Sequence, residues 1–336
     1  MSIFDSFRAA STPGTAVEIA SHRVSAASLE SSGGTPLIVA HATEPLKEGS
    51  LVPSLTAANV HDRAAVVAAL NRVFDRIGGH PRRVSLVVPD LVAKVSLVRF
   101  EQVPDRAQDL DQLVRWQVRK TAPFPIEDAQ VSHVPGQRSA EGQDFIVSLA
   151  RRETVQEYEG LCGEVGAHAG IVDLATFNVI NAILVGAIAQ GYDPAAASDW
   201  LLVNVAPDYA SIAIVRGEHL IFFRNRSSDG DGTLADLVHQ TAMYYEDRLN
   251  GGGFGQVFLA GASGTGRQAS DVEQVRRSLE DRLKTAVHTV DPRAAASMTD
   301  RISAAPALLD TMAPLVGVLL RDSRRRAARS GPPTQS

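Results

Sequence analysis

Two stretches of the chain, one in each half, open with the same succession of short apolar runs and turns. The first reads TAVEIASHRVSAASLE and then TPLIVAHATEPL, with Ser31-Ser32-Gly33-Gly34 as the turn between the alternating runs. The second, WLLVNVAPDYASIAIVRGEHLIFFRN, predicts three strands separated by Pro207-Asp208 and by Gly217-Glu218. A helical pattern follows each stretch. This internal repeat predicts two related α/β lobes, each built on a strand, hairpin and helix unit.

The segments between and after the two repeats alternate between strand and helix patterns. Short buried runs such as RRVSLVVPD, AKVSLVRFEQVP and QVFLAGA predict strands. Apolar residues at helical spacing predict helices over Thr56–Ile77, Phe177–Ile188, Leu234–Leu249, Asp271–Lys284 and Ala304–Leu320. The Ala/Pro-rich segment that ends near Ser198 predicts the connection between the halves. A length of 336 residues is enough for two or three such lobes.

Composition excludes several classes of function. The net charge of −5 and the sequence pI of about 6.0 give no basic field for nucleic acid. The single cysteine, Cys162, rules out a disulfide framework and lies in a helical pattern that predicts burial. The nine histidines lack metal-site spacing, so no metal site is expected. No signal peptide is recognisable, and the window Ala304–Leu320 is too short and interrupted to span a membrane, which predicts a soluble cytoplasmic protein.

The stretch Asp111–Pro135 combines a helix, a stiff step and a strand. Leu110, Leu113, Trp116 or Val114, and Val118 recur at helical spacing. Pro123 and Pro125 end that helix, because proline fixes φ and lacks an amide donor, and they leave Phe124 between them. Ile126–Val134 then predicts an edge strand. The stretch could form the wall of a binding groove, or an ordinary corner whose Trp116 and Phe124 are core residues.

With this stretch in place, the chain resembles the PilM family, the cytoplasmic actin-like proteins of type IV pilus assembly. That family is related to FtsA and to the cytoplasmic part of the type II secretion protein GspL. The resemblance covers most of residues 84 to 321. Its segments are VRWQVRKTAPFPIEDAQVSHV, FIVSLARRETVQEYEGLCGEVGAHAGIVDLATFNVINAI, WLLVNVAPDYASIAIVRGEHLIFFRN and MAPLVGVLLRD.

The resemblance implies an α/β fold of the two-lobed actin-like kind, a duplicated RNase H-like unit with a small subdomain inserted in lobe 1. The expected division is a flexible N-terminus over 1–13, lobe 1 over 14–192, lobe 2 over 193–321 and a disordered basic tail over 322–336. The inserted subdomain is expected at about residues 90–150. Lobe 2 is expected to be reduced, because only one helix and a triple glycine separate FFRN from QVFLAG, where relatives carry a second inserted subdomain.

The resemblance also implies two phosphate loops with an Asp-x-Gly pattern, and both loops depart from it. The matching positions are Glu18-Ile19-Ala20, followed by Ser21, and Asn204-Val205-Ala206. A Cβ at each glycine position crowds the space for phosphate oxygens. Gly261 and Gly264 match the adenosine motif, although a plain strand-to-helix turn also explains them. We therefore expect a pseudo-ATPase with no catalytic residues, no metal and no cofactor, with weak ATP binding left open.

In PilM-like proteins, a cleft beside the inserted subdomain receives the short cytoplasmic N-terminus of PilN, a bitopic inner-membrane protein. We expect the groove for a PilN-like peptide to be lined by Trp116, Arg119, Phe124, Pro125, Val131 and Val134. The expected function is a non-catalytic scaffold at the inner face of the inner membrane, peripheral through this partner, with other pilus assembly proteins as further candidate partners. The alternatives are an active actin-like ATPase or sugar-kinase-like enzyme, and a divisome adaptor like FtsA.

Overall fold

The computed structural model describes residues 12–32, 35–193, 198–230, 232–265, 269–300, 302 and 305–322, so most of the predicted N-terminal segment and basic tail lie outside the described residues. The strands are β1 (Thr15–Ala20), β2 (Arg23–Ser32), β3 (Thr35–Pro45), β4 (Arg83–Val88), β5 (Ala93–Phe100), β6 (Ala129–Ser139), β7 (Gly142–Arg151), β8 (His168–Leu174), β9 (Trp200–Val205), β10 (Tyr209–Arg216), β11 (His219–Ser227), β12 (Gln256–Ala260), β13 (Val287–Thr289) and β14 (Ser297–Met298). The helices are α1 (Arg63–Arg76), α2 (Ala107–Arg119), α3 (Arg152–Glu164), α4 (Ala175–Ala189), α5 (Leu234–Arg248), α6 (Ala269–Leu283) and α7 (Pro306–Leu319).

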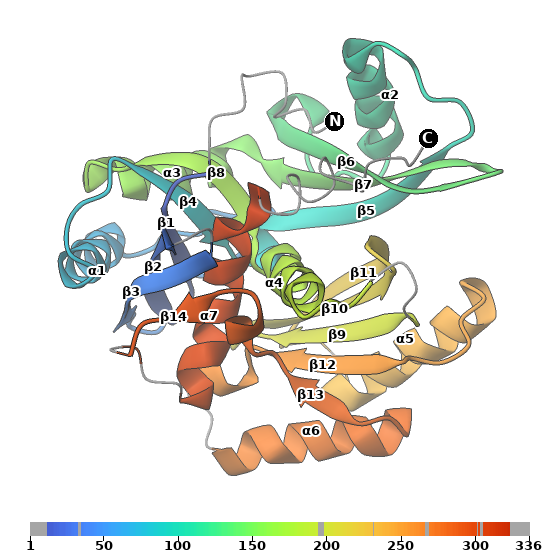
Figure 1. Cartoon of the computed structure of the whole chain (residues 1–336). Coiled ribbons are helices and arrows are strands. Elements are labelled where there is room, and N and C mark those ends of the chain that lie inside the picture. The colour runs from blue at the N-terminus through green and yellow to red at the C-terminus, as the bar shows by residue number, and fades with distance from the viewer. Residues whose placement is uncertain are drawn as a thin grey trace, which may run out of the picture.

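The two larger sheets repeat one arrangement (Figure 1). The first sheet has the order β14-β3-β2-β1-β4-β8, and the second has the order β11-β10-β9-β12-β13. In each sheet three consecutive antiparallel strands are followed by two parallel ones: β4 pairs with β1 as β12 pairs with β9, and β8 pairs with β4 as β13 pairs with β12. This equivalence confirms the predicted duplication.

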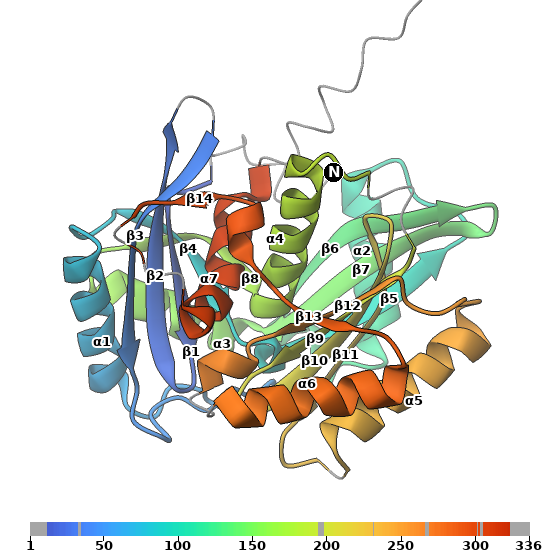
Figure 2. The ribbon, with the colours of Figure 1, turned by 60° about the horizontal axis from the view of Figure 1, so that its bottom comes forward.

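Helices α4 and α7 lie between the two sheets and form the centre of the molecule (Figures 1 and 2). Helix α7 packs on the first sheet through Met312, Leu315 and Val316, while α4 packs on the second through Val179 and Leu184. The two helices approach so closely that a Cβ on Gly317 would lie 1.8 Å from the carbonyl oxygen of Asn178. The outer faces are covered by α1 and α3 on the first sheet and by α5 and α6 on the second.

The C-terminal part of the chain returns to the first sheet. Strand β14 pairs in parallel with β3, and α7 covers β1, β2 and β4. Both elements come from the range 193–321, which the sequence assigns to lobe 2. None of the helices in the described part of the chain is long and apolar enough to cross a lipid bilayer.

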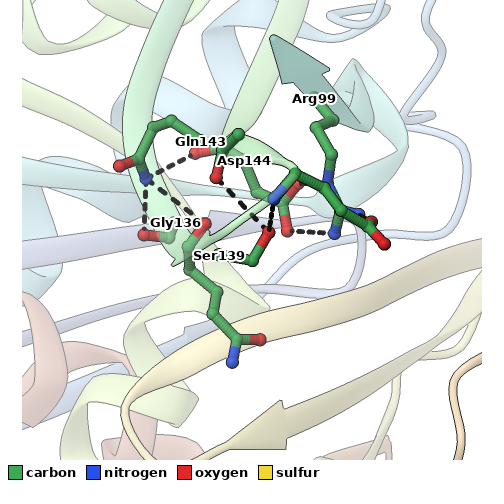
Figure 3. A network of polar contacts seen from close by, with 8 residues as sticks. Arg99, Gly136, Ser139, Gln143 and Asp144 are labelled. Atoms are coloured by element: carbon green, nitrogen blue, oxygen red, sulfur yellow. Dashed lines mark hydrogen bonds and ion pairs between the residues drawn. The ribbon is translucent and has the colours of Figure 1, made fainter. Parts of the chain in front are cut away.

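The third sheet, in the order β5-β7-β6, carries α2 on one face. A β-bulge between Pro135 and Arg138 interrupts the pairing of β6 with β7. The side-chain amide of Gln143 donates to the carbonyl oxygen of Gly136 at 2.8 Å, which satisfies an acceptor near the bulge (Figure 3). Beside it, Arg99 forms a bidentate ion pair with Asp144, with nitrogen–oxygen distances of 2.6 and 3.1 Å. These contacts fix the tip of the β6–β7 hairpin.

The first helix is shorter than the sequence predicts. It begins at Arg63 rather than at Thr56, because Asp62 caps it by accepting a hydrogen bond from the amide of Ala65. The preceding residues form a loop closed by an antiparallel bridge between Leu51 and Val60. The apolar Val60, which was counted in the helical pattern, therefore belongs to this bridge.

Candidate functional site

The residues expected around a degenerate nucleotide site come together between the two lobes. Residues from the β1–β2 turn, the β9–β10 turn and the end of β12 line one cavity: Glu18, Ala20, Ser21, Asn204, Ala206 and Gly261. Gly264 lies in the 3₁₀ turn Ala262–Thr265 that follows β12. The cavity volume is about 30 Å³, which is about the room of one water molecule. Small-molecule sites usually have about 300–1,000 Å³, so this space does not fit a nucleotide.

The first loop is closed by its own side chains. The buried carboxylate of Glu18 accepts from the Nη2 of Arg23 at 2.8 Å, and both side chains are largely shielded from solvent. Arg23 also lies 2.5 Å from the Nε2 of His22. In actin-like ATPases the acid at this position binds metal and water. Here the acid, Glu18, is instead paired with Arg23.

The glycine loop after β12 is occupied by a carboxylate from α7. Asp310 accepts from the amide of Gly261 at 2.5 Å and from the amide of Ser263 at 2.7 Å. Gly261 has a φ of +78°, and a Cβ there would lie 2.0 Å from the carbonyl oxygen of Val205, so only glycine fits. Backbone amides that could contact an anionic ligand are thus already satisfied within the chain.

A fully buried carboxylate, which sequence analysis missed, joins the lobes beside this cavity. Asp90 follows β4, and its carboxylate accepts from the amide of Thr176 at 3.1 Å, from the Thr176 hydroxyl and from the Ser211 hydroxyl at 2.6 Å. Its backbone amide donates to the Tyr209 hydroxyl at 3.1 Å. The side chain of Asn204 donates to the Thr176 hydroxyl at 2.8 Å, which ties the second loop into the same network. No cation pairs with Asp90 among the described residues.

Burial raises the pKa of Asp90 above its usual value, while the hydrogen bonds from Ser211 and Thr176 act in the opposite direction. Burial beside Asp90 also raises the pKa of Tyr209 well above its usual value. A single aspartate after a buried strand gave no signal for this role, because its partners Thr176 and Ser211 lie 86 and 121 residues further along the chain.

A much larger groove lies between the third sheet and the helical centre of the molecule. Its cavity volume is about 480 Å³. The third sheet contributes Ser132, His133, Val134 and Pro135 from β6, with Ile146 and Ser148 from β7. The opposite wall comes from β8, α4, the β10–β11 turn, the start of β11 and the segment just after α7. Its residues are Val172, Asp173, Phe177, Asn178, Ile180, Asn181, Glu218, His219, Leu220 and Arg321.

The lining of this groove includes polar groups with fixed partners. Asp173 and Arg321 form an ion pair at 3.3 Å, and burial nevertheless raises the pKa of Asp173. The amide side chain of Asn181 donates to the carbonyl oxygen of Gly317 at 2.6 Å. A lining that combines apolar side chains with oriented polar groups is typical of a ligand or peptide site.

The residues predicted for a partner groove do not share one surface. Val134 lines the groove, whereas Val131 and Phe124 pack on the other face of the third sheet, in the core beneath α2. Trp116, Arg119 and Pro125 are exposed on the outer side of that core. The interpretation of Trp116 as a core residue is wrong, because Val114 and Val118 are the buried residues of α2. Successive side chains of a strand point to opposite faces of the sheet, so Val131 and Val134, three residues apart on β6, lie on different faces.

Two further expectations can be placed in the structure. Cys162 is buried in α3 as predicted, and burial raises the pKa of its thiol to about 12, which leaves it unreactive at neutral pH. Within the described residues, no group of three or more His, Cys, Asp or Glu side chains is placed to hold a metal ion.

One family model and several solved structures are similar to this chain. Residues 16–250 match the family model described as type IV pilus assembly protein PilM. A solved structure entitled "PilM-PilN type IV pilus biogenesis complex" aligns with a TM-score of 0.75 at 17% identity, over 94% of this chain and 99% of that one. The cytoplasmic domain of EpsL, from the type II secretion system of Vibrio cholerae, aligns with a TM-score of 0.44 at 9% identity, over 73% and 80% of the two chains. No curated protein sequence matches.

Proposed function

The chain belongs to the type IV pilus assembly protein PilM family, and we propose that it is a non-catalytic scaffold that binds the N-terminal cytoplasmic peptide of a PilN-like membrane protein. The binding site is the groove between the third sheet and α4. Through this partner the chain is held at the inner face of the inner membrane, and other pilus assembly proteins are further candidate partners.

The groove carries this proposal. Its volume of about 480 Å³ is in the range of ligand sites, and its apolar lining by Val134, Ile146 and Leu220 suits the side chains of a short apolar segment. Strand β6 is at the edge of its sheet, so its outer backbone groups are available for strand-like pairing. The Asp173–Arg321 ion pair supplies charged groups at one side of the groove.

The non-catalytic part of the proposal is supported by the contents of the interlobe cavity. Arg23 is paired with Glu18, and Asp310 holds the glycine-loop amides of Gly261 and Ser263. With about 30 Å³ left between these groups, the residues do not fit a nucleotide.

The groove can be tested with a synthetic peptide copied from the cytoplasmic N-terminus of a PilN-like protein. Val134→Glu places a charge in the groove at a half-exposed position, so we expect peptide affinity to fall about tenfold or more in calorimetry, with little change in folding. Val52→Glu is the matched control, because Val52 is exposed between β3 and α1, outside the groove. Equal binding by wild type, Val134→Glu and Val52→Glu would exclude this groove.

A further inference from the structure

The last turn of α2 presents an exposed aromatic ring next to a cation. Trp116 is 59% exposed, although tryptophan is among the most buried side chains on average. The ammonium group of Lys120 lies 5.4 Å from the centre of the Trp116 ring, which is within the range of a cation–π contact. Arg115 and Arg119 are neighbouring residues of α2, one before and three after Trp116. Arg119 and Lys120 are exposed, and Arg115 is half-buried. We call Arg115, Trp116, Arg119 and Lys120 the α2 patch.

The cations of the α2 patch have no acidic partners within the described residues, which sets them apart from other cations of this chain. Arg276 pairs with Glu273 and Glu280 on α6, and Arg99 pairs with Glu141 and Asp144. Asp111 is spaced to pair with Arg115 one turn along α2, but its carboxylate lies 3.0 Å from the ring of the buried His133. Asp111, the acidic residue best spaced to pair with Arg115, is therefore directed to the third sheet instead.

Another cation lies at the same end of the third sheet. The ammonium group of Lys94, on β5, donates to the carbonyl oxygen of Thr121 just after α2, at 2.7 Å. The patch is thus a local positive surface on a protein whose net charge is −5. Helix α2 lies on the outside of the molecule, on the far side of the third sheet from α4 (Figure 1).

We propose that the α2 patch binds the headgroup layer of an anionic lipid membrane. Arginine and lysine are attracted to the negative surface potential of such a layer. Tryptophan favours the boundary between headgroups and acyl chains, where its ring is apolar and its N–H remains hydrated. Trp116 is the single large apolar side chain exposed on α2, because Val114 and Val118 point inward, so the patch lacks the broad apolar centre that protein interfaces have.

This contact is separate from the groove. The patch and the groove lie on opposite faces of the third sheet, so lipid binding does not depend on the proposed partner peptide. The two can therefore be measured independently on the same full-length chain.

Intrinsic fluorescence gives a direct measurement, because the chain has two tryptophans and Trp200 is buried. We expect vesicles of phosphatidylcholine with phosphatidylglycerol, at low salt, to shift the Trp116 emission to shorter wavelength and to sediment the protein. Vesicles of phosphatidylcholine alone should do neither. The Trp116→Phe variant should lose the emission shift.

Substitution of the cations tests whether this patch is responsible. For the variant R115Q/R119Q/K120Q we expect vesicle affinity to fall by roughly tenfold or more, since each cation near an anionic surface contributes severalfold. The control K47Q/R224Q/R248Q removes the same charge from exposed positions on other elements and should bind like wild type. Thermal unfolding should be alike in all three proteins.

Three results would overturn the proposal. They are no binding of the wild type to phosphatidylglycerol vesicles, an equal loss in the control variant, and binding of soluble polyglutamate in preference to vesicles. The last result would assign the patch to an acidic protein partner instead.

Discussion

The carboxylate of Asp90 accepts a hydrogen bond from the Ser211 hydroxyl at 2.6 Å, and this contact connects the two lobes. Ser211→Ala leaves the buried carboxylate with the two donors of Thr176 alone. We expect the free energy of unfolding to fall by about 1.5–3 kcal/mol, the range for a hydrogen bond to a charged group. Urea unfolding measures it, with Ser278→Ala on the exposed face of α6 as the control. Equal stability of the two variants would contradict a structural role for this contact.

The same carboxyl group predicts a pH dependence. Burial raises the folded-state pKa of Asp90 above the unfolded value of about 3.9. The stabilisation from the protonated group is therefore fully present below the unfolded pKa and is lost as pH rises through the folded pKa. We expect the difference in unfolding free energy between wild type and Asp90→Asn to shift in favour of wild type as the pH is lowered from 7 toward 4. A difference that stays constant with pH would show that Asp90 titrates normally.

The interlobe site shows which contacts can be predicted from the sequence and which cannot. The resemblance to the PilM family placed Glu18, Ala20, Asn204 and Ala206 in two nucleotide-site loops, and these residues do line one cavity. It could not predict that Asp310 would join them, because a lone aspartate in an apolar helix has no local signature. Its contacts are with amides 49 and 47 residues earlier, and only the packing of α7 on the first sheet brings them together.

Asp310 should protect two specific amides from exchange. In Asp310→Ala, the N–H groups of Gly261 and Ser263 lose a charged acceptor, and we expect their hydrogen exchange to become about tenfold faster or more. Residue-resolved exchange by NMR measures this change. Asp281→Ala, at an exposed position on α6, should leave both amides unchanged. Unchanged exchange in Asp310→Ala would mean that other groups hold the loop.

Nucleotide binding should not return when the two glycines are restored. We expect wild type and Ala20→Gly/Ala206→Gly to show no heat of MgATP binding at about millimolar nucleotide, because the Arg23–Glu18 pair and Asp310 still fill the cavity. Calorimetric titration decides the matter, with hydrolysis measured against Glu18→Ala as a background control. A micromolar dissociation constant for the wild type, or turnover above that background, would favour the alternative of an active ATPase.

The stretch around α2 shows a second limit of sequence interpretation. Helical spacing located the helix, and the two prolines located its end, because both are properties of neighbouring residues. Whether Trp116 faces the core or solvent depends on which stripe of α2 meets the third sheet. Val114 and Val118 form that stripe, and Trp116 is two residues away from each, on the opposite side of the helix.

Phe124 and Val134 were both predicted to line the partner groove, but they lie on opposite faces of the third sheet and should respond differently to substitution. Phe124 is half-buried against the core beneath α2, so Phe124→Ala should cost about 1–3 kcal/mol of unfolding free energy, less than the roughly 3–5 kcal/mol of a fully buried phenylalanine. The folded fraction should still bind a PilN-like peptide normally, because Phe124 lies on the face of the third sheet away from the groove. Val134→Glu should do the reverse. Urea unfolding and peptide calorimetry on both variants separate the cases, and loss of peptide binding by stable, folded Phe124→Ala would move the partner site to the α2 side of the sheet.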